Sequence, residues 1–348
     1  MLSDDIYMQR CIDLALPGLG HVAPNPLVGA VVVLKDKIIG EGFHRRYGGH
    51  HAEVEAIQAV EDKSLLKRST LYVNLEPCCH HGKTPPCTDL IMKSDIPHVV
   101  IGTVDPFDAV AGKGIARLRS QGVNVRVGVL KDECRELNKR FFAFYEKKRP
   151  YIILKWAQTA DGYIDINRLS NAEKRPTWIT SEKLRMLVHK WRTEEAAIMV
   201  GTETALKDNP KLNVRDWHGP NPCRIVIDRR LRLSPDYNLL DDTQPTLVFN
   251  EMQSKTTGNT RFIQIPFNQN ILPHVMKFLF EERLQSLIVE GGRKLLQSFI
   301  DSNLWDEARI FTGSQFFCDG IKAPNLLSVK NKAHIIIGQE GFFRIKNA

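Results

Sequence analysis

Apolar residues follow two alternating patterns along the chain, one with a spacing of three or four residues and one of short continuous runs. The first pattern predicts amphipathic helices and the second predicts buried strands. In the first part of the chain, helices are predicted at 4–16, 51–60, 87–94, 114–120 and 131–146. Strands are predicted at 28–34, 38–43, 70–75, 99–103 and 123–127. This alternation with short connections predicts an α/β layer sandwich.

A charged segment that ends in proline, Lys147-Lys148-Arg149-Pro150, interrupts the pattern, which then starts again. We therefore predict two domains, 1–147 and 150–348. In the second domain, helices are predicted at 181–190, 203–207, 271–281 and 293–301. Strands are predicted at 151–158, 196–200, 224–228, 246–249, 261–265, 286–290, 307–312, 333–339 and 342–346. The last of these strands are expected to close an α/β core as antiparallel edge strands.

The composition is that of a globular protein with two domains. The chain has 348 residues, of which 43% are hydrophobic and 25% charged, both ordinary values. It lacks an apolar run of about 18 residues, and its acidic first residues lack the apolar stretch of a signal peptide. The seven cysteines are odd in number and scattered, so they do not form a disulfide framework. We expect a cytoplasmic protein without a membrane partner.

The net charge of +8 raises the question of a nucleic-acid partner. The positive charges are spread over both predicted domains, and the sequence has neither a basic arm nor an arginine-rich stripe. Dispersed charge of this kind fits small anionic ligands as readily as a polynucleotide.

The strongest chemical signal is a histidine two residues before a glutamate, followed by two Pro-Cys pairs. These residues are His51, Glu53, Cys78 and Cys87. One imidazole and two thiolates are zinc ligands, and three protein ligands leave the fourth position for a water whose pKa falls to about 7. The glutamate relays protons between the water and a departing amino group. This pattern predicts a zinc deaminase site with one zinc per chain and Glu53 as the general acid/base.

Two alternatives compete with a catalytic zinc site. A structural zinc site needs a fourth ligand, which His80 or His81 could supply. A disulfide between Cys78 and Cys87 carries less weight because nothing in the sequence indicates secretion. The order of the ligands and the apolar strand that precedes Cys78 favour catalysis.

Weaker candidates lie elsewhere in the chain. Asn25 is held between two prolines, which suits a substrate-binding amide, although a plain turn has about equal weight. A predicted strand ends in Gly291-Gly292 before a helix, an arrangement that lets phosphates approach backbone amides, or that is a bare turn. Arg192 and Arg215 could clamp a phosphate, and a solvated face is the alternative. The dinucleotide fingerprint Gly-x-Gly-x-x-Gly is absent from the sequence.

These motifs together resemble the bifunctional riboflavin-biosynthesis deaminase/reductase family over nearly the whole chain. The first domain carries Pro24-Asn25-Pro26-x-Val28-Gly29, His51-Ala52-Glu53-Val54, and Leu75-Glu76-Pro77-Cys78 through Thr84-Pro85-Pro86-Cys87. The second carries Lys155 with Asp161-Gly162, Trp178-Ile179-Thr180-Ser181, Asp208-Asn209-Pro210-x-Leu212, Arg224-Ile225-Val226-Ile227-Asp228 and Glu290-Gly291-Gly292. The eight residues between the two zinc-ligand cysteines are a specific feature of this resemblance.

The resemblance implies a cytidine-deaminase-like three-layer sandwich at 1–147 and a dihydrofolate-reductase-like α/β domain at 150–348. It implies zinc-dependent hydrolytic deamination of a diaminopyrimidinone ribosylamine 5′-phosphate, then NADPH-dependent reduction of its ribose to a ribityl chain. Zinc ligands are implied at His51, Cys78 and Cys87. NADPH contacts are implied at Ala157, Trp178, Thr204, Asp208, Gly291 and Gly292. Substrate contacts are implied at Arg192, Leu212, Arg215 and Glu290, in addition to the Asn25 amide.

The chain departs from the family pattern at three places. Glu55 stands where a histidine is common, Cys79 stands where a serine is usual, and the segment 163–176 is longer and more charged than expected. As partners we expect a small phosphorylated pyrimidine and further copies of the chain, and no nucleic acid. Two competing hypotheses are an RNA deaminase with an appended binding domain and a non-enzymatic protein with structural zinc.

Overall fold

The computed structural model describes residues 3–80, 85–168, 173–326, 332–337 and 340–347. It divides the chain into two compact units, Met1–Lys148 and Arg149–Ala348. None of the helices in the described ranges is long and apolar enough to cross a membrane.

The first unit is built on a sheet with the strand order β2-β1-β3-β4-β5. Its strands are β1 (Gly29–Leu34), β2 (Lys37–Phe43), β3 (Thr70–Leu75), β4 (His98–Thr103) and β5 (Asn124–Val127). Strand β1 runs antiparallel to both neighbours, whereas β3, β4 and β5 run parallel. The carboxyl ends of β3 and β4 therefore lie at one edge of the sheet, which is where ligands of α/β folds bind.

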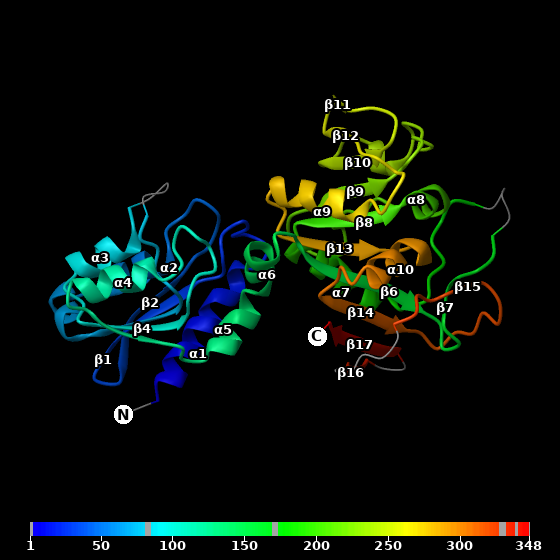
Figure 1. The fold of residues 1–348 in the computed structure, drawn as a ribbon. Helices are drawn as coiled ribbons and strands as arrows, with labels where there is room; N and C mark the ends of the chain where they lie inside the picture. Colours follow the sequence, from blue (N-terminus) through cyan, green and yellow to red (C-terminus); the bar gives the residue numbers. More distant parts are fainter. Residues whose placement is uncertain (1–2, 81–84, 169–172, 327–331, 338–339, 348) are drawn as a thin grey trace. The chain divides into compact units, whose positions relative to one another are not determined.

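Helices cover both faces of this sheet, as Figure 1 shows: α2, α3 and α4 lie on one side, and α1 and α5 on the other. The bounds are α1 (Asp4–Ala15), α2 (Ala52–Ala59), α3 (Cys87–Lys93), α4 (Lys113–Ser120), α5 (Lys131–Leu137) and α6 (Lys139–Lys147), with short 3₁₀ helices at Leu16–Gly18 and Lys63–Arg68. Alternate residues of β1 enter two separate cores. Ala30 and Val32 pack in the core under α2, and Val31 and Val33 pack in the core under α1. This confirms the three-layer sandwich.

One helix predicted as continuous, 131–146, is divided between α5 and α6 at Asn138. The side chain of Asn138 is 2% exposed and bonds the backbone of a distant residue. The Leu27 N–H donates to Asn138 Oδ1 at 2.8 Å, and Asn138 Nδ2 donates to the Leu27 carbonyl at 2.8 Å. Asn74 Nδ2 donates to the same carbonyl at 2.9 Å. A tertiary contact invisible to helical periodicity thus anchors the loop that carries Asn25.

Replacing Asn138 with Ala is expected to destabilise the first unit by about 2 kcal/mol, because it leaves the buried Leu27 N–H without its partner. Urea unfolding of the zinc-loaded protein measures the change. Asn124→Ala is the control, since that side chain is exposed at the start of β5. Equal effects of the two substitutions would contradict the anchoring role of Asn138.

The second unit is built on a sheet with the order β11-β12-β10-β9-β8-β13-β6-β14-β17-β16. Strands from β12 to β14 in this order run parallel, and β11, β17 and β16 are antiparallel additions at the two edges. The bounds are β6 (Tyr151–Gln158), β8 (Ala197–Gly201), β9 (Cys223–Ile227), β10 (Thr246–Asn250), β11 (Lys255–Thr257), β12 (Thr260–Gln264), β13 (Ser286–Glu290), β14 (Glu307–Thr312), β16 (Lys332–Ile337) and β17 (Glu340–Lys346). The expected antiparallel closing strands are therefore present.

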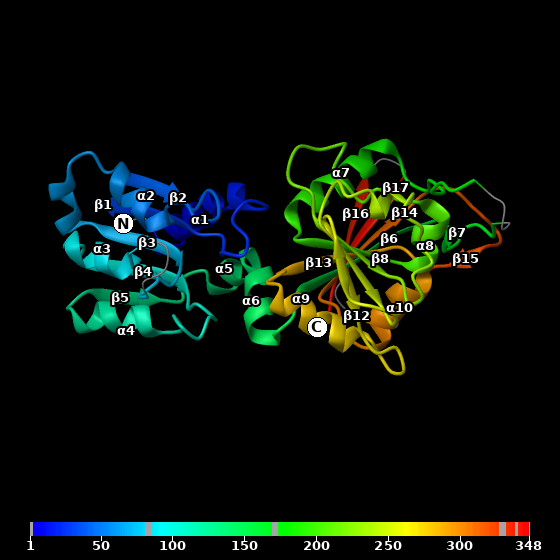
Figure 2. The ribbon, with the colours of Figure 1, turned by 90° about the horizontal axis from the view of Figure 1, so that it is seen from above.

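Helices flank this sheet as well. Figure 2 shows α7 on one side of the sheet and α9 and α10 on the other. The bounds are α7 (Glu182–Glu194), α8 (Thr202–Asp208), α9 (Leu272–Glu281) and α10 (Arg293–Asp301), with a 3₁₀ helix at Asn238–Leu240. A separate pair of short strands, β7 (Tyr163–Asp165) and β15 (Ile321–Lys322), was not predicted because neither strand is buried enough to carry an apolar pattern.

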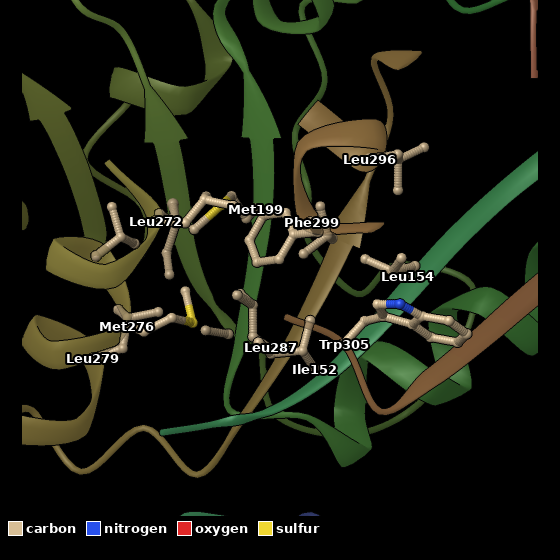
Figure 3. Packing of buried hydrophobic residues seen from close by; sticks show 14 of the residues in the cluster. Ile152, Leu154, Met199, Leu272, Met276, Leu279, Leu287, Leu296, Phe299 and Trp305 are labelled. Carbon is tan, nitrogen blue, oxygen red and sulfur yellow. The ribbon is translucent and has the colours of Figure 1, made fainter. Parts of the chain in front are cut away.

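The apolar core under α9 and α10 is drawn in Figure 3. Met276 and Leu279 from α9 and Phe299 from α10 pack there against Leu154 and Leu287 of the sheet. The opposite face packs against α7 through Trp191, whose ring stacks on Phe311 with centroids 5.4 Å apart. These two faces support the α/β core that holds the carboxyl ends of β8, β9 and β13 together.

Candidate active sites of the two units

In the first unit, three zinc-ligand candidates converge from two helix starts and one loop. His51 caps α2, Cys87 is the first residue of α3, and Cys78 follows β3. His51 Nδ1 lies 3.2 Å from Cys87 Sγ and 3.6 Å from Cys78 Sγ. The ligand atoms of the three residues all lie within 4.8 Å of one another. One histidine and two cysteines at this separation fit a zinc ion with an open position.

The electrostatics of these residues favour a thiolate. The hydrogen bond with Cys87, together with the neighbouring His51, lowers the pKa of Cys78 to about 4. The hydrogen bond with Cys78 raises the pKa of His51 to about 9. The hydrogen bond with Cys78 also raises the pKa of the Cys87 thiol well above its ordinary range. Zinc binding requires deprotonated thiols. One thiolate is thus already favoured at neutral pH, and a dication would favour the second.

No fourth protein ligand joins the cluster among the described residues. His80, one of the two candidates for a structural site, packs edge-on against Phe107 with centroids 6.2 Å apart. His81 lies outside the described residues. Cys78 and Cys87 are free thiols, which excludes the disulfide between them. Among the described residues, the ligand set is that of a catalytic site.

Glu53 lies in the first turn of α2 and is 3% exposed. Burial raises the pKa of its carboxyl group, because the charged form loses hydration. A carboxyl group whose pKa is shifted toward neutrality is suited to both accepting and returning a proton. Glu53 and His51 both line one cavity of about 250 Å³. The cavity is therefore large enough for a pyrimidine ring beside the metal site.

Asn25 lines the same cavity, and His44 fixes the orientation of its amide. His44 Nδ1 lies 2.8 Å from the carbonyl of His50, so Nδ1 must carry the proton. Burial lowers the pKa of His44, so the ring is neutral and its Nε2 accepts from Asn25 Nδ2 at 3.1 Å. The Asn25 carbonyl oxygen is then left for a ligand. Sequence reasoning missed His44, which has no motif of its own.

The two single-residue departures of the first unit have different locations. Glu55 pairs with His50 at 3.1 Å and with Arg45 at 3.7 Å, and it does not line the cavity. Cys79 is half-buried and does not belong to the ligand cluster. Neither substitution therefore alters the zinc-ligand set.

In the second unit, Arg192 and Glu290 form a buried ion pair. Arg192 Nη2 donates to Glu290 Oε2 at 2.9 Å, and Nη1 donates to the Asn213 carbonyl at 3.0 Å. Burial by itself raises the pKa of Glu290, but Arg192 and the neighbouring Lys155 outweigh it and lower that pKa to about 2. Arg192 Nε and Glu290 Oε1 are buried and have no hydrogen-bond partner among the described residues. Buried polar atoms of this kind are available to a ligand.

The paired glycines after β13 lie against α8. Gly291 and Gly292 have φ angles of +77° and +74°, and a Cβ on either would come within 3.0 Å of the Thr204 side chain. Only glycine fits this bend without strain. The bend brings backbone amides and the Thr204 hydroxyl to the carboxyl edge of the sheet, where dinucleotides bind in α/β folds.

The other predicted site residues of the second unit have defined positions, but the described part of the structure does not join them to the Arg192–Glu290 pair or to the paired glycines. Ala157 lies half-buried on β6, Leu212 is 3% exposed, and the ring of Trp178 is half exposed under the Arg185 guanidinium. Arg215 is largely exposed, and its backbone N–H donates to His189 Nδ1 at 3.1 Å. Within the described ranges, no hydrogen bond joins Trp178 or Ala157 to the Arg192–Glu290 pair.

His189 gives the second unit a pH-dependent stability. The ring is 2% exposed, and burial, with Arg192 and Arg215 nearby, lowers its pKa to about 4. The unfolded ring binds more protons than the folded one between pH 6.5 and 4, so the stability present above pH 6.5 is lost as the pH falls to about 4. The loss is expected to reach about 3 kcal/mol. Urea unfolding of the second unit at pH 7.5 and 5 measures it.

The control for this titration is His189→Asn, which retains an acceptor for the Arg215 N–H but does not titrate. We expect a flatter dependence of the unfolding free energy on pH in that variant. An equally steep dependence in both proteins would assign the titration to another group.

Family models match both units. The model described as the cytidine and deoxycytidylate deaminase zinc-binding region matches residues 1–103. The model described as the RibD C-terminal domain matches residues 150–327.

Curated relatives match over nearly the full length. The chain is 39% identical over 331 residues to riboflavin biosynthesis protein RibD of Aquifex aeolicus, with 93% of this chain and 90% of the relative covered. It is 43% identical over 330 residues to the RibD protein of Synechocystis, with 93% and 88% covered.

Solved structures agree with this similarity. The diaminohydroxyphosphoribosylaminopyrimidine deaminase/5-amino-6-(5-phosphoribosylamino)uracil reductase of Thermotoga maritima superposes with a TM-score of 0.87 at 37% identity, covering 99% of this chain and 98% of that one. Acinetobacter baumannii RibD superposes with a TM-score of 0.87 at 29% identity, with the same coverage.

Proposed function

The chain belongs to the RibD family of bifunctional riboflavin-biosynthesis deaminase/reductases, and we propose which of its residues perform each of the two reactions. The enzyme deaminates a diaminopyrimidinone ribosylamine 5′-phosphate and then reduces the ribose of the product with NADPH. We assign the deaminase to residues 1–147 and the reductase to residues 150–348. The observation that carries the assignment is the His51, Cys78 and Cys87 cluster beside the buried Glu53.

For deamination, His51, Cys78 and Cys87 would hold a zinc ion that supplies an activated water at neutral pH. Water adds to the ring carbon that carries the amino group, and the amino group leaves as ammonia. Glu53 accepts the proton of the attacking water on its carboxylate and transfers it to the departing nitrogen. The Asn25 carbonyl, oriented by His44, holds the pyrimidine in the cavity.

For reduction, bound NADPH would supply the hydride that the sugar carbon needs to become the first carbon of the ribityl chain, and a proton would complete the reduction. Hydride transfer needs no protein nucleophile, so the second unit acts by positioning its two ligands. The bend at Gly291 and Gly292, with Thr204, exposes backbone amides to the phosphates of the dinucleotide. Ala157, Trp178 and Asp208 are the further proposed cofactor contacts.

The Arg192–Glu290 pair belongs to the proposed substrate site of the reductase. Its Nε and Oε1 atoms are buried without a partner among the described residues, so Nε can donate to a hydroxyl or phosphate oxygen of the substrate and Oε1 can accept from a hydroxyl group. Leu212 would pack against this ligand. Arg215 is exposed enough to reach a phosphate group.

The partners and location follow from the chemistry of the site. The substrate is a small pyrimidine, and an RNA deaminase is not favoured because residues 150–327 match the RibD C-terminal domain. We further propose that the chain does not bind nucleic acid and that it forms homo-oligomers, which light scattering after size-exclusion chromatography measures. The location that we propose is the cytoplasm, a reducing compartment in which the Cys78 and Cys87 thiols stay available for a metal.

The experiment that tests this function combines zinc analysis with NADPH oxidation. We expect about one zinc per chain, as three ligands and one open position require, and loss of NADPH absorbance that depends on the deaminated ribosylaminouracil phosphate. Zinc without NADPH oxidation would refute the reductase assignment, and NADPH oxidation without zinc would refute the deaminase assignment.

A further inference from the structure

The segment between β7 and α7 brings a buried arginine to the end of α8. The Arg168 side chain is 8% exposed and lies between two carboxylates. Its Nη2 donates to Asp165 Oδ1 at 2.8 Å, and its Nη1 donates to Asp208 Oδ1 at 2.8 Å. Asp165 ends β7 and Asp208 ends α8. One guanidinium group thus joins two elements that are far apart in the sequence.

The remaining donors of Arg168 hold the chain that leads to Trp178. Nη1 also donates to the Arg175 carbonyl at 2.8 Å, and Nη2 donates to Thr177 Oγ1 at 3.1 Å. Nε donates to Asp165 Oδ1 at 3.2 Å. A guanidinium group has five N–H donors, and these contacts engage all three of its nitrogens. Arg168 is therefore not available to bind an anionic ligand directly, and its effect must act through the residues that it holds.

The end of α8 is held from a second side as well. Asn209 has a left-handed backbone with φ of 42°. The Asn238 N–H donates to Asn209 Oδ1 at 2.8 Å, and Asn238 Nδ2 donates to the Asn209 carbonyl at 2.6 Å. These bonds hold the backbone after Asp208 but do not touch its carboxylate. Arg168 alone, among the described side chains, forms an ion pair with that carboxylate.

The pairing also favours the charged form of the Asp208 carboxylate. Burial raises the pKa of Asp208, and Arg168 opposes this shift through its charge and its hydrogen bond. Without Arg168, a largely buried carboxylate would face Asp165 with only the weaker influence of Lys207 to offset it, and its side chain would turn toward solvent.

We propose that Arg168 is a positioning residue of the reductase, which fixes Asp208 and the Thr177–Trp178 segment in the orientation that receives NADPH. This inference rests on the proposed function, in which Asp208 and Trp178 contact the cofactor. Arg168 lies in the segment 163–176, which the sequence predicts to depart from the family pattern.

The test is Arg168→Met in the full-length protein, assayed with NADPH and the deaminated substrate. We expect the KM for NADPH to rise about tenfold, the scale of one lost charge-assisted hydrogen bond, with kcat within about twofold. Deamination and zinc content should not change. Arg175→Met is the matched control, because that side chain lies on the same segment, is 75% exposed and, among the described residues, forms an ion pair with Glu173 alone.

A double-mutant cycle shows whether Arg168 acts through Asp208. If it does, Arg168→Met combined with Asp208→Asn raises the KM for NADPH little more than Asp208→Asn by itself. Arg168→Lys should restore part of the affinity, since an ammonium group can pair with one carboxylate but lacks the planar fork.

Three results would overturn the inference: an unchanged KM in Arg168→Met, a KM increase equal to that of Arg175→Met, or fully additive effects in the cycle. If Arg168→Met shows no thermal unfolding transition of the second unit, that unit has not folded. Arg168→Lys then tests the inference in its place. In that variant, a raised KM with an unchanged transition supports the inference, and an unchanged KM overturns it. Failure of the proposed function is distinguishable, because the unsubstituted enzyme would then not oxidise NADPH at all.

Discussion

Glu53→Gln is expected to slow deamination by orders of magnitude while the protein keeps its zinc. Gln has nearly the shape of Glu and fills the same buried place in the first turn of α2, but its amide cannot accept and return a proton. Loss of a general acid/base lowers the rate by about 10²- to 10⁴-fold. Glu53 is not one of the three clustered ligands, so the metal remains. Ammonia release and metal analysis on the same sample measure the two properties.

Two controls accompany this substitution. Glu55→Gln changes the same residue type two positions along α2, where the carboxylate pairs with His50 and does not line the cavity. We expect that variant to deaminate normally. Reduction of the already deaminated substrate by Glu53→Gln should also be normal. Undiminished deamination by Glu53→Gln would remove Glu53 from the mechanism.

Arg192→Met is expected to have the second largest effect, on both the activity and the stability of the second unit. It leaves Glu290 buried without the guanidinium group that does most to hold its pKa down to about 2, and the neighbouring Lys155 is then the main group that opposes the effect of burial. Breaking a buried ion pair by removing one member costs about 3–5 kcal/mol. The same change removes the guanidinium Nε proposed to face the substrate. We expect kcat/KM for the reduction to fall by at least about 10²-fold.

Steady-state NADPH oxidation and urea unfolding of the second unit measure these two effects. Arg192→Lys keeps a positive charge beside Glu290, so it should restore more of the stability of the second unit than of the reduction rate. Lysine lacks the planar guanidinium group that also bonds the Asn213 carbonyl. Lys183→Met is the control, an exposed change on the same helix. If Arg192→Met reduces the substrate at the normal rate, the substrate site lies elsewhere.

The zinc site could be predicted from the sequence because its chemistry depends on residue types and on short spacings. His51, Glu53 and Cys87 lie at or near the starts of two helices, and local patterns place helix starts well. The three clustered ligands and the preceding strand could be derived from those residues, and the role of Glu53 as general acid/base stays a prediction. The absence of a fourth ligand among the described residues required the structure, since His80 was an equally good candidate by position and turns instead to Phe107.

The sequence by itself also determined the alternation of strands and helices, because the apolar period of each element is local. The order of the strands, the break at Asn138 and the orienting role of His44 were decided only by the tertiary structure. Each depends on a partner distant in sequence: Asn138 bonds Leu27, 111 positions away. Arg168 shows the same limit. Its charge was visible in the segment 163–176, but its function depends on Asp208, 40 positions later, which only folding brings within 2.8 Å.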